Sequence, residues 1–393
     1  MAVLHVVSRL LVALLPAAAA AAQQAPPEAL APPLPQGRRL LPDDCRLPAA
    51  APHVAVGADG TVLVSFASDD AIWCAVSRDG GRSFLSPDRV GAAGELEAGV
   101  SRGPRGVVTD DALVVLAVCG ETLRGQDGNL LAWRSTDHGL HWTGPVRVND
   151  VPESAREGLH DVAAGSKGEV FCVWLDLRGS GTELWGDVSA DGGATFGLDR
   201  PLYASPDGSV CECCAPSVAI DPATGQAIAM WRNKLGPNRD MYALRAGLED
   251  QAVAEPAQLL GTGHWELAAC PMAGGGVAVS SRGELLSFWR RGTTLCTAAP
   301  GLSELQVAEG REAAVAAGPD GFVLLWTDGA GVVTTARAPS LGGVAGLRPL
   351  GRGLNLHLAG APDGHGPVLA VWETGEGRAD SLRVEVLAER RAP

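Results

Sequence analysis

The amino-acid sequence predicts an all-β fold, a β-propeller built from four-stranded antiparallel blades. The first observation is a repeated pattern of a short apolar strand, a Gly/Asp turn and a second strand that ends in Trp or Phe. The second is the spacing, because consecutive copies start 38 to 59 residues apart, a period that suits four short strands per unit. Clear copies start at His53, Asp161, Ser217, Gly276, Ala314 and His357, and a degenerate copy starts at Gly106.

These seven copies predict seven blades. The last copy runs out of chain after three strands, so we expect a segment near the N-terminus, around residues 43–48 (DDCRLP), to supply its fourth strand. Such closure removes the open sheet edges that otherwise pair with other chains. A two-sheet sandwich is the alternative fold, but it does not require a returning period of this length.

The N-terminal segment predicts export. Residues 1–22 contain an apolar run after Arg9, and Ala20 and Ala22 are small residues of the kind that signal peptidase accepts before Gln23. The run is too short to span a bilayer, so we expect no transmembrane anchor. The Pro- and Ala-rich segment 23–40 is typical of a flexible linker, and 41–393 is expected to be a single propeller domain. We expect a secreted or periplasmic monomer.

The overall charge excludes one class of partner. The chain carries a formal net charge of -14 and has a pI near 5.0. Binding to a polyphosphate backbone needs clustered Lys and Arg side chains. Nucleic acid is therefore not an expected partner.

A second motif, S-x-D-x-G-x-x-[FW], occurs three times, at residues 77–84, 135–142 and 189–196. In each copy the Asp can accept backbone N–H bonds across a turn, Gly supplies positive φ, and the aromatic ring packs below the hairpin. The three copies resemble the Asp boxes (BNR repeats) of the sialidase superfamily, and the chain is similar to an exported, bacterial-type exo-α-sialidase. The resemblance implies that the boxes lie at the blade rims, away from the chemistry. It also implies six blades, whereas the counted repeats favour seven.

One mouth of the propeller channel is the expected site. Residues that lead into the inner strands converge there, and ligand sites usually lie in such a mouth. These lead-in residues include His53, Arg102, Arg105, Asp161, Asn355 and His357.

The turns after the second strands are expected to open on the same mouth. Arginines from separate blades suit a grip on the carboxylate of an anionic sugar; solvated charges and salt bridges to the neighbouring Asp and Glu residues are the alternative. The candidate catalytic residues of the mouth are Asp69, Asp70, Asp176, Arg178, Arg232, Arg239, Asp240, Arg290, Arg311 and Glu312.

The resemblance to sialidases implies an arginine grip, an Asp acid/base and a Tyr nucleophile. Segment 46–48 (RLP) is similar to an element that precedes the first blade in that family, and Asp69 or Asp70 falls near the acid/base position. The chain has only two tyrosines, Tyr203 and Tyr242, and none in its final third, where the nucleophile is expected. Two functions therefore stay open: a glycoside hydrolase acting on extracellular glycans, or a non-catalytic propeller that binds a glycan, a protein or a metal.

Nine cysteines in an exported chain cannot all pair with one another. Cys211, Cys213 and Cys214 precede the inner strand of the fourth blade, and Cys270 precedes that of the fifth, so we expect these sulfurs to lie together. Alternation along an extended segment would let three of the four meet at one point. Two disulfides are one interpretation; the other is a thiolate site for Zn or Cu, completed by a histidine such as His160.

Overall fold

The structure is a computed structural model that describes residues 37–41, 48–248, 252–340, 342–374 and 382–389. These residues belong to one compact unit and form strands and turns, with no helix in the described ranges. No candidate for a membrane-crossing helix occurs among them.

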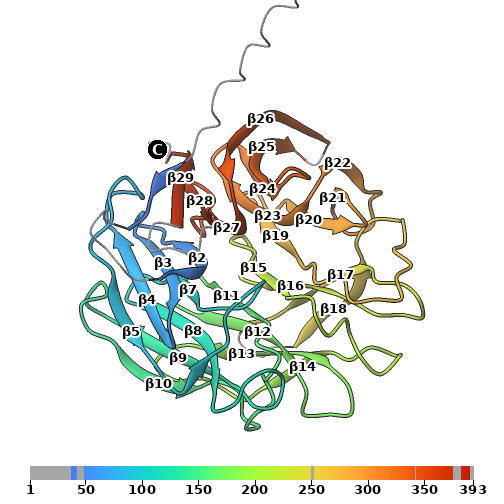
Figure 1. Cartoon of the computed structure of the whole chain (residues 1–393). Helices are drawn as coiled ribbons and strands as arrows, with labels where there is room; N and C mark the ends of the chain where they lie inside the picture. Colours follow the sequence, from blue (N-terminus) through green and yellow to red (C-terminus); the bar gives the residue numbers. More distant parts are fainter. Residues whose placement is uncertain (1–36, 42–47, 249–251, 341, 375–381, 390–393) are drawn as a thin grey trace, which may run out of the picture. The chain divides into compact units, whose positions relative to one another are not determined.

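Seven antiparallel sheets follow one another around a central channel in chain order, from blue to red (Figure 1). The predicted propeller of seven four-stranded blades is confirmed, and the alternative of six blades is wrong. The inner strands are β2 (Ala50–Val56), β7 (Arg105–Val108), β11 (His160–Ala164), β15 (Ser217–Ile220), β19 (Gly275–Val279), β23 (Arg311–Gly318) and β27 (Leu354–Gly360). The second strands are β3 (Val62–Ser68), β8 (Leu113–Gly120), β12 (Val170–Asp176), β16 (Ala227–Arg232), β20 (Leu285–Arg291), β24 (Gly321–Thr327) and β28 (Val368–Glu373).

The outer half of each blade is a further pair of strands. The third strands are β4 (Ala71–Ser77), β9 (Asn129–Ser135), β13 (Glu183–Ser189), β17 (Met241–Ala246), β21 (Thr294–Ala298), β25 (Val332–Ser340) and β29 (Leu382–Ala388). The outermost strands are β5 (Asp88–Gly91), β10 (Thr143–Arg147), β14 (Arg200–Tyr203), β18 (Val253–Leu259), β22 (Leu305–Glu309), β26 (Gly343–Arg352) and, in the last blade, β1 (Arg38–Arg39). In the second blade the short strand β6 (Glu95–Leu96) also pairs with the end of β8.

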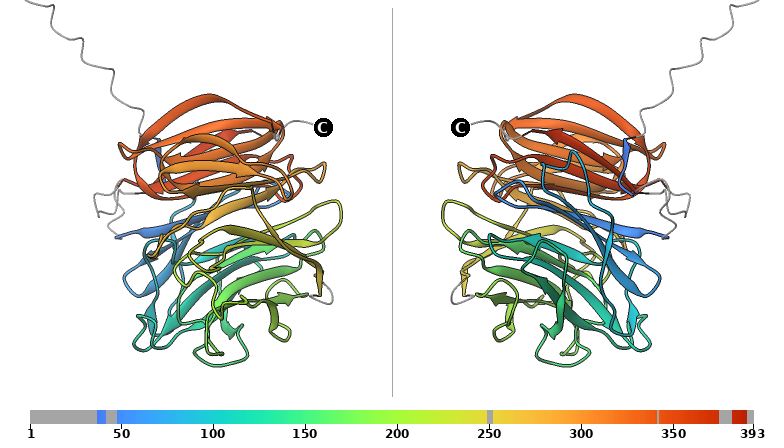
Figure 2. Two further views of the ribbon diagram at one scale, coloured as in Figure 1. Left: turned by 90° about the vertical axis from the view of Figure 1, so that its right-hand side faces the viewer. Right: turned by 90° about the vertical axis from the view of Figure 1, so that its left-hand side faces the viewer.

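The ring closes where the last blade meets the first. Strand β27 contacts β2, and the red strands of the last blade lie beside the blue strands of the first (Figure 1 and Figure 2). Strand β1 pairs with β29, with Arg38 opposite Val384. Closure by the N-terminal segment is as predicted, but the closing strand lies within the expected linker 23–40. Of the expected closing segment 43–48, only the last residue is described.

An aromatic residue near the end of six of the seven second strands packs between blades. Trp174, Trp231, Trp289, Trp326 and Trp372 are fully buried in five successive blades, and Phe66 is buried in the first. Each hydrophobic cluster of the described chain combines residues of two neighbouring blades. Burial of these large rings stabilises the contact of one blade with the next, which explains their periodic spacing in the sequence.

The S-x-D-x-G turns form the expected hydrogen bonds between third and fourth strands. In the third blade the Ser189 hydroxyl donates to Asp191 Oδ1 at 2.7 Å and accepts the Gly193 N–H at 2.8 Å. Asp191 also accepts the Thr195 N–H at 2.9 Å. The corresponding bonds recur in the first and second blades. The turns therefore lie at the outer part of the blades, away from the channel.

Candidate functional site

The central channel holds a cavity of about 660 Å³ that is lined by residues of all seven inner strands. Small apolar residues of the inner strands line most of it. Its charged and imidazole-bearing residues stand before or within the first four residues of inner strands, with one exception from the end of β20. The polar lining residues that concern us are His53, Arg105, Asp161, Arg290, Arg311, Glu312, Asn355 and His357. The mouth at the strand starts is therefore the polar one, as expected.

Arg105 and Asp161 stand at the starts of β7 and β11, and their opposite charges influence each other. Burial raises the pKa of the Asp161 carboxyl, although Arg105 and the Val218 N–H, 2.9 Å from Asp161 Oδ2, act in the opposite direction. Burial also lowers the pKa of Arg105, and Asp161 partly offsets this effect. A carboxyl group that holds its proton more readily is suited to donate it, which makes Asp161 a candidate acid.

His53 and His357 stack in the channel with ring centroids 3.7 Å apart. Burial holds the pKa of both imidazoles well below the ordinary value, and Arg105 adds to this effect. His53 Nδ1 accepts the Gly106 N–H at 3.2 Å, and His357 Nδ1 accepts the Val54 N–H at 3.4 Å. Both rings are therefore neutral at pH 7, with the proton on Nε2.

Arg290 and Arg311 come from neighbouring blades and lack acidic partners in the described part of the chain. The exposed Arg311 guanidinium forms no hydrogen bond with any described residue. Arg290 donates to the Pro271 carbonyl at 2.9 Å, and its buried Nε has no partner. Burial lowers the pKa of Arg290; Cys214 opposes this, and Arg311 contributes to it. Two cationic groups thus face the mouth with donors to spare.

Hydrogen bonds hold Glu312 and Asn355 at the wall of the cavity. Glu312 Oε2 accepts the Thr327 hydroxyl at 2.6 Å, and Oε1 accepts the Asn355 N–H at 2.8 Å. The Asn355 side-chain amide donates to Glu373 Oε1 at 3.0 Å. These bonds link the starts of β23 and β27, so the Glu312 carboxylate is held at the cavity wall.

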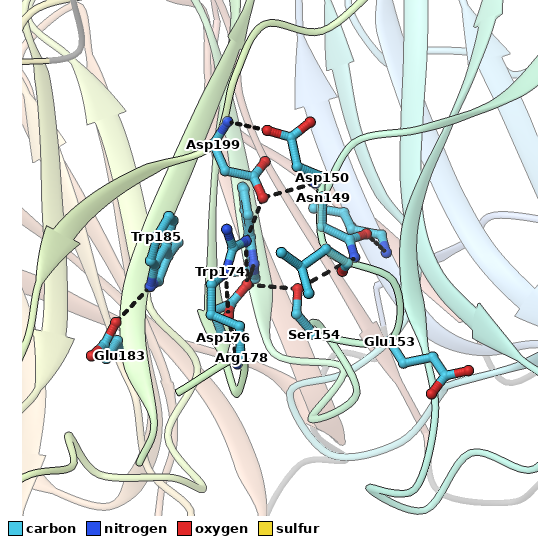
Figure 3. Close-up of polar contacts among 12 residues, drawn as sticks. Asn149, Asp150, Glu153, Ser154, Trp174, Asp176, Arg178, Glu183, Trp185 and Asp199 are labelled. Carbon is cyan, nitrogen blue, oxygen red and sulfur yellow. Dashed lines mark hydrogen bonds and ion pairs between the residues drawn. The ribbon is translucent and has the colours of Figure 1, made fainter. Parts of the chain in front are cut away.

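Asp176 and Arg178 do not line the cavity. The buried Asp176 carboxylate accepts hydrogen bonds from the Ser154 hydroxyl and Trp174 Nε1, both at 2.7 Å, and from Arg178 (Figure 3). Arg178 also pairs with Asp199 and lies over the Trp185 ring, 3.7 Å from its centroid. The bonds to the two carboxylates outweigh burial and raise the pKa of Arg178. This network joins the second and third blades.

Arg232, Arg239 and Asp240 also lie outside the cavity lining. Buried Arg232 donates to the carbonyls of Ala273, Arg239 and Arg290 at 2.6–2.9 Å. Arg239 donates to carbonyls of its own loop. Asp240 accepts from His264 Nδ1 at 2.6 Å and from the Trp265 N–H at 2.8 Å. The three residues hold the loops that precede β19.

The candidates Asp69 and Asp70 do not match the lining of the cavity either. Asp69 and Asp70 are exposed in the turn between β3 and β4 and do not line the cavity. Tyr203 receives a hydrogen bond from Asn233 at 2.9 Å and packs on Trp231, and Tyr242 packs on the same Trp. Neither tyrosine lines the cavity. Arginine 46 of the RLP segment lies outside the described residues.

The cysteine segment brings its sulfurs together. Cys213 forms a disulfide with Cys270, and the Cys211 and Cys214 sulfurs lie 3.5 Å apart. The segment is a turn rather than an extended strand, since the Cys214 N–H donates to the Cys211 carbonyl at 3.4 Å. The expected alternation does not occur, but three of the four sulfurs meet at one point, as predicted, and Cys270 is joined to them through its bond to Cys213. A hydrogen bond from Cys211, together with Arg232, lowers the pKa of the Cys214 thiol to about 7 against the effect of burial.

His160 does not join this cluster. Among the described residues, the group able to hold a metal ion jointly consists of Cys211, Cys213 and Cys214. The His160 nitrogens lie 3.4 Å from the carbonyls of Gly158 and Leu116, and burial, with Arg105, lowers the pKa of His160 to about 3. The remaining described cysteines, Cys74, Cys119, Cys172 and Cys296, are buried free thiols.

Solved structures share this architecture at low sequence identity. No family model and no curated protein matches the chain. A Hadza microbial sialidase is 14% identical, with 89% of this chain and 68% of that chain covered and a TM-score of 0.50. The chain shares the propeller fold of this sialidase.

Two lyases are similar to the same degree. A polysaccharide lyase of family PL25, an ulvan lyase bound to -[GlcA(1-4)Rha3S]-, is 8% identical over 90% of this chain and 96% of that chain, with a TM-score of 0.56. Virginiamycin B lyase from Staphylococcus aureus, an inactive variant with quinupristin, is 13% identical over 89% and 98%, with a TM-score of 0.51. At such identities the likeness concerns the fold alone.

Proposed function

We propose that the polar channel mouth binds a saccharide that carries a carboxylate group. The observation that carries this proposal is the pair Arg290 and Arg311, which line the cavity without an acidic partner in the described structure. Guanidinium groups bind carboxylates through charge-assisted, often bidentate hydrogen bonds. An anion in the mouth would use donors that the protein itself leaves free.

The solved propellers of similar fold support a carbohydrate ligand. One is a sialidase, and another is a lyase bound to a fragment whose symbols denote glucuronic acid and sulfated rhamnose. A cavity of about 660 Å³ has the size of known small-molecule sites. The small, open mouth suits a terminal sugar or a short oligosaccharide.

Hydrolysis of that saccharide is a second candidate function, and Asp161 favours it. Its pKa is raised by burial, and it lines the same cavity as the Glu312 carboxylate. Glycoside hydrolysis uses one protonated and one ionised carboxyl group on either side of the scissile bond. Asp161 would donate the proton and Glu312 would supply the ionised group. If the protein does not hydrolyse the saccharide, the same site only binds it.

Calorimetric titration tests the proposed function. We expect sialyllactose and a glucuronate-containing disaccharide to bind, and lactose, which has no carboxylate, to bind much more weakly. Arg311→Ala should weaken binding of the acidic sugars about tenfold or more, because a hydrogen bond to a charged group is lost.

Arg282→Ala is the matched control for Arg311→Ala. Arg282 is equally a surface arginine, but it lies in the turn at the far end of β19 and pairs with Glu284. Its substitution should leave saccharide affinity unchanged. Equal affinity for acidic and neutral sugars, or an Arg311→Ala variant that binds as well as the wild type, would contradict the proposal.

We also propose that the protein is exported, with residues 1–22 as the cleaved signal. Expression of the full sequence in a Gram-negative host should yield a periplasmic protein whose N-terminus is Gln23. Mass spectrometry of the intact product checks this. A cytoplasmic product that keeps residues 1–22 would contradict it.

A further inference from the structure

Three sulfur atoms before β15 form a nearly equilateral triangle. The Sγ distances are 3.5 Å for Cys211–Cys214 and 3.9 Å for both Cys211–Cys213 and Cys213–Cys214. Cys270 is bonded to Cys213, so a fourth sulfur lies beside this triangle. Four cysteines from two neighbouring blades therefore converge on one small volume.

The size of this triangle matches a face of a metal–thiolate tetrahedron. With Zn–S bonds of about 2.3 Å, two ligands of a tetrahedral ion are about 3.8 Å apart. The measured edges lie on either side of this value. Thiolates are the ligands that select Zn(II) and Cu(I). The turn that contains the cysteines already has the dimensions of such a site.

The positive charges around the cysteine cluster would be balanced by an anion. Buried Arg232 lies beside Cys211 and Cys214, and its hydrogen bonds in the described chain go to carbonyls, not to carboxylates. Arg290 likewise contacts a carbonyl, and its charge acts on Cys214. A buried cation without a counter-ion is costly. Four thiolates on one divalent cation carry a net negative charge that these two arginines would balance.

The backbone supplies a further contact of the kind found around metal ligands. The Ala273 N–H donates to Cys214 Sγ at 3.4 Å. Such bonds orient and tune thiolate ligands in metal sites. Ala273 follows Cys270 closely in the chain, so the same loop provides both a sulfur and a donor.

We propose that Cys211, Cys213, Cys214 and Cys270 form a redox-switched site for one thiophilic cation, Zn(II) or Cu(I). When the Cys213–Cys270 disulfide is closed, two thiols remain and the full ligand set is absent. A dithiol reductant transfers two electrons and two protons to this disulfide and becomes a disulfide itself. The cation then binds the four thiolates as their protons leave. Exchange with a disulfide oxidant, which takes up two electrons and two protons and becomes a dithiol, closes the Cys213–Cys270 bond again and releases the cation. Exposed Cys270 gives a reductant access to the bond.

Metal binding by the reduced protein tests this proposal. The mature chain is reduced with a phosphine under argon, freed of reductant and incubated with zinc sulfate; bound zinc is then measured by mass spectrometry. We expect about one zinc per chain after reduction and none in the oxidised protein. With Co(II) as the probe, the reduced protein should show the visible bands of tetrahedral thiolate coordination.

Substitutions locate the bound ion. Cys214→Ser should abolish zinc binding, whereas Cys296→Ser, which removes a buried thiol of β21 outside the cluster, should retain it. If Cys214→Ser does not fold, alkylation of the reduced wild type is the alternative test. Zinc should protect the four clustered cysteines from iodoacetamide, which peptide mapping would show. Absence of both zinc and copper from the reduced wild type after incubation with each ion, or equal labelling with and without either ion, would overturn the proposal. Binding of Cu(I) but not Zn(II) would support it and identify the cation.

Discussion

Asp176 shows, at the scale of a single residue, a charge that serves stability rather than the cavity. Replacing it by Ala leaves Arg178 and Trp174 Nε1 without their buried acceptor. Removing one partner of a buried ion pair typically costs about 3–5 kcal/mol. We therefore expect Asp176→Ala to lower the free energy of unfolding in urea by this amount and to leave the saccharide affinity of the folded fraction intact.

The neighbouring Glu153 provides the control for Asp176 (Figure 3). Its side chain is exposed, so Glu153→Gln should change stability by less than about 0.5 kcal/mol. A fully stable Asp176→Ala variant that no longer binds acidic saccharides would show that the carboxylate belongs to the ligand site.

The two tyrosines lead to a second prediction at this scale. Because Tyr203 and Tyr242 pack on Trp231 and neither lines the cavity, we expect little release of a fluorogenic group from a standard sialic-acid substrate. Fluorimetry with the wild type, Tyr203→Phe and Tyr242→Phe tests this. Turnover that Tyr203→Phe abolishes would restore a tyrosine mechanism, and turnover that survives both changes would show that another nucleophile operates.

At the scale of an element, the S-x-D-x-G turn of the third blade depends on one buried hydroxyl. Ser189→Ala leaves the Gly193 N–H unsatisfied, which should cost about 1–3 kcal/mol in chemical unfolding. Thr195→Ala removes an exposed hydroxyl that donates to the same Asp191, at 2.7 Å, and should cost less than about 1 kcal/mol. Equal losses for the two variants would mean that the Ser189 hydroxyl has no special part in the turn.

The sequence predicts elements well where the signal is local. A turn motif, a strand pair and a terminal Trp recur within one blade, so counting them gives the blade number and the rim position of the turns. Lead-in position likewise placed His53, Arg105 and Asp161 at the polar mouth. Of the predicted catalytic residues, which came from lead-in segments and from the turns after second strands, Arg290, Arg311 and Glu312 line the cavity.

Local signals failed where packing between blades decides the direction of a side chain. Asp176 and Arg232 end second strands, and their side chains turn into loops between neighbouring blades instead of the channel. Sequence spacing does not predict the direction of these side chains, because that direction depends on the twist of the blade. The predicted directions of the cysteine side chains were wrong for a different reason. They rested on the alternation of side chains along an extended chain, whereas residues 211–214 form a tight turn.

At the scale of the whole molecule, closure by β1 should contribute measurably to stability. Leu40 and Leu41 follow β1 and are buried against Leu382 and Val384 of the last blade. Burying two leucines is worth about 3–6 kcal/mol. A chain that starts at residue 42 should therefore unfold at lower urea than one that starts at residue 34, and its free β29 edge should promote association, visible by size-exclusion chromatography. Identical unfolding of the two chains would show that closure is dispensable.

The pairing of Arg38 with Val384 also sets an order of events in time. Six blades draw their strands from one continuous stretch of chain and can form as that stretch emerges. The seventh needs residues from both ends, so its sheet cannot be completed before synthesis has reached the last strand. Contacts between such distant residues form slowly. We therefore expect the pairing of β1 with β29 to be the last step of folding.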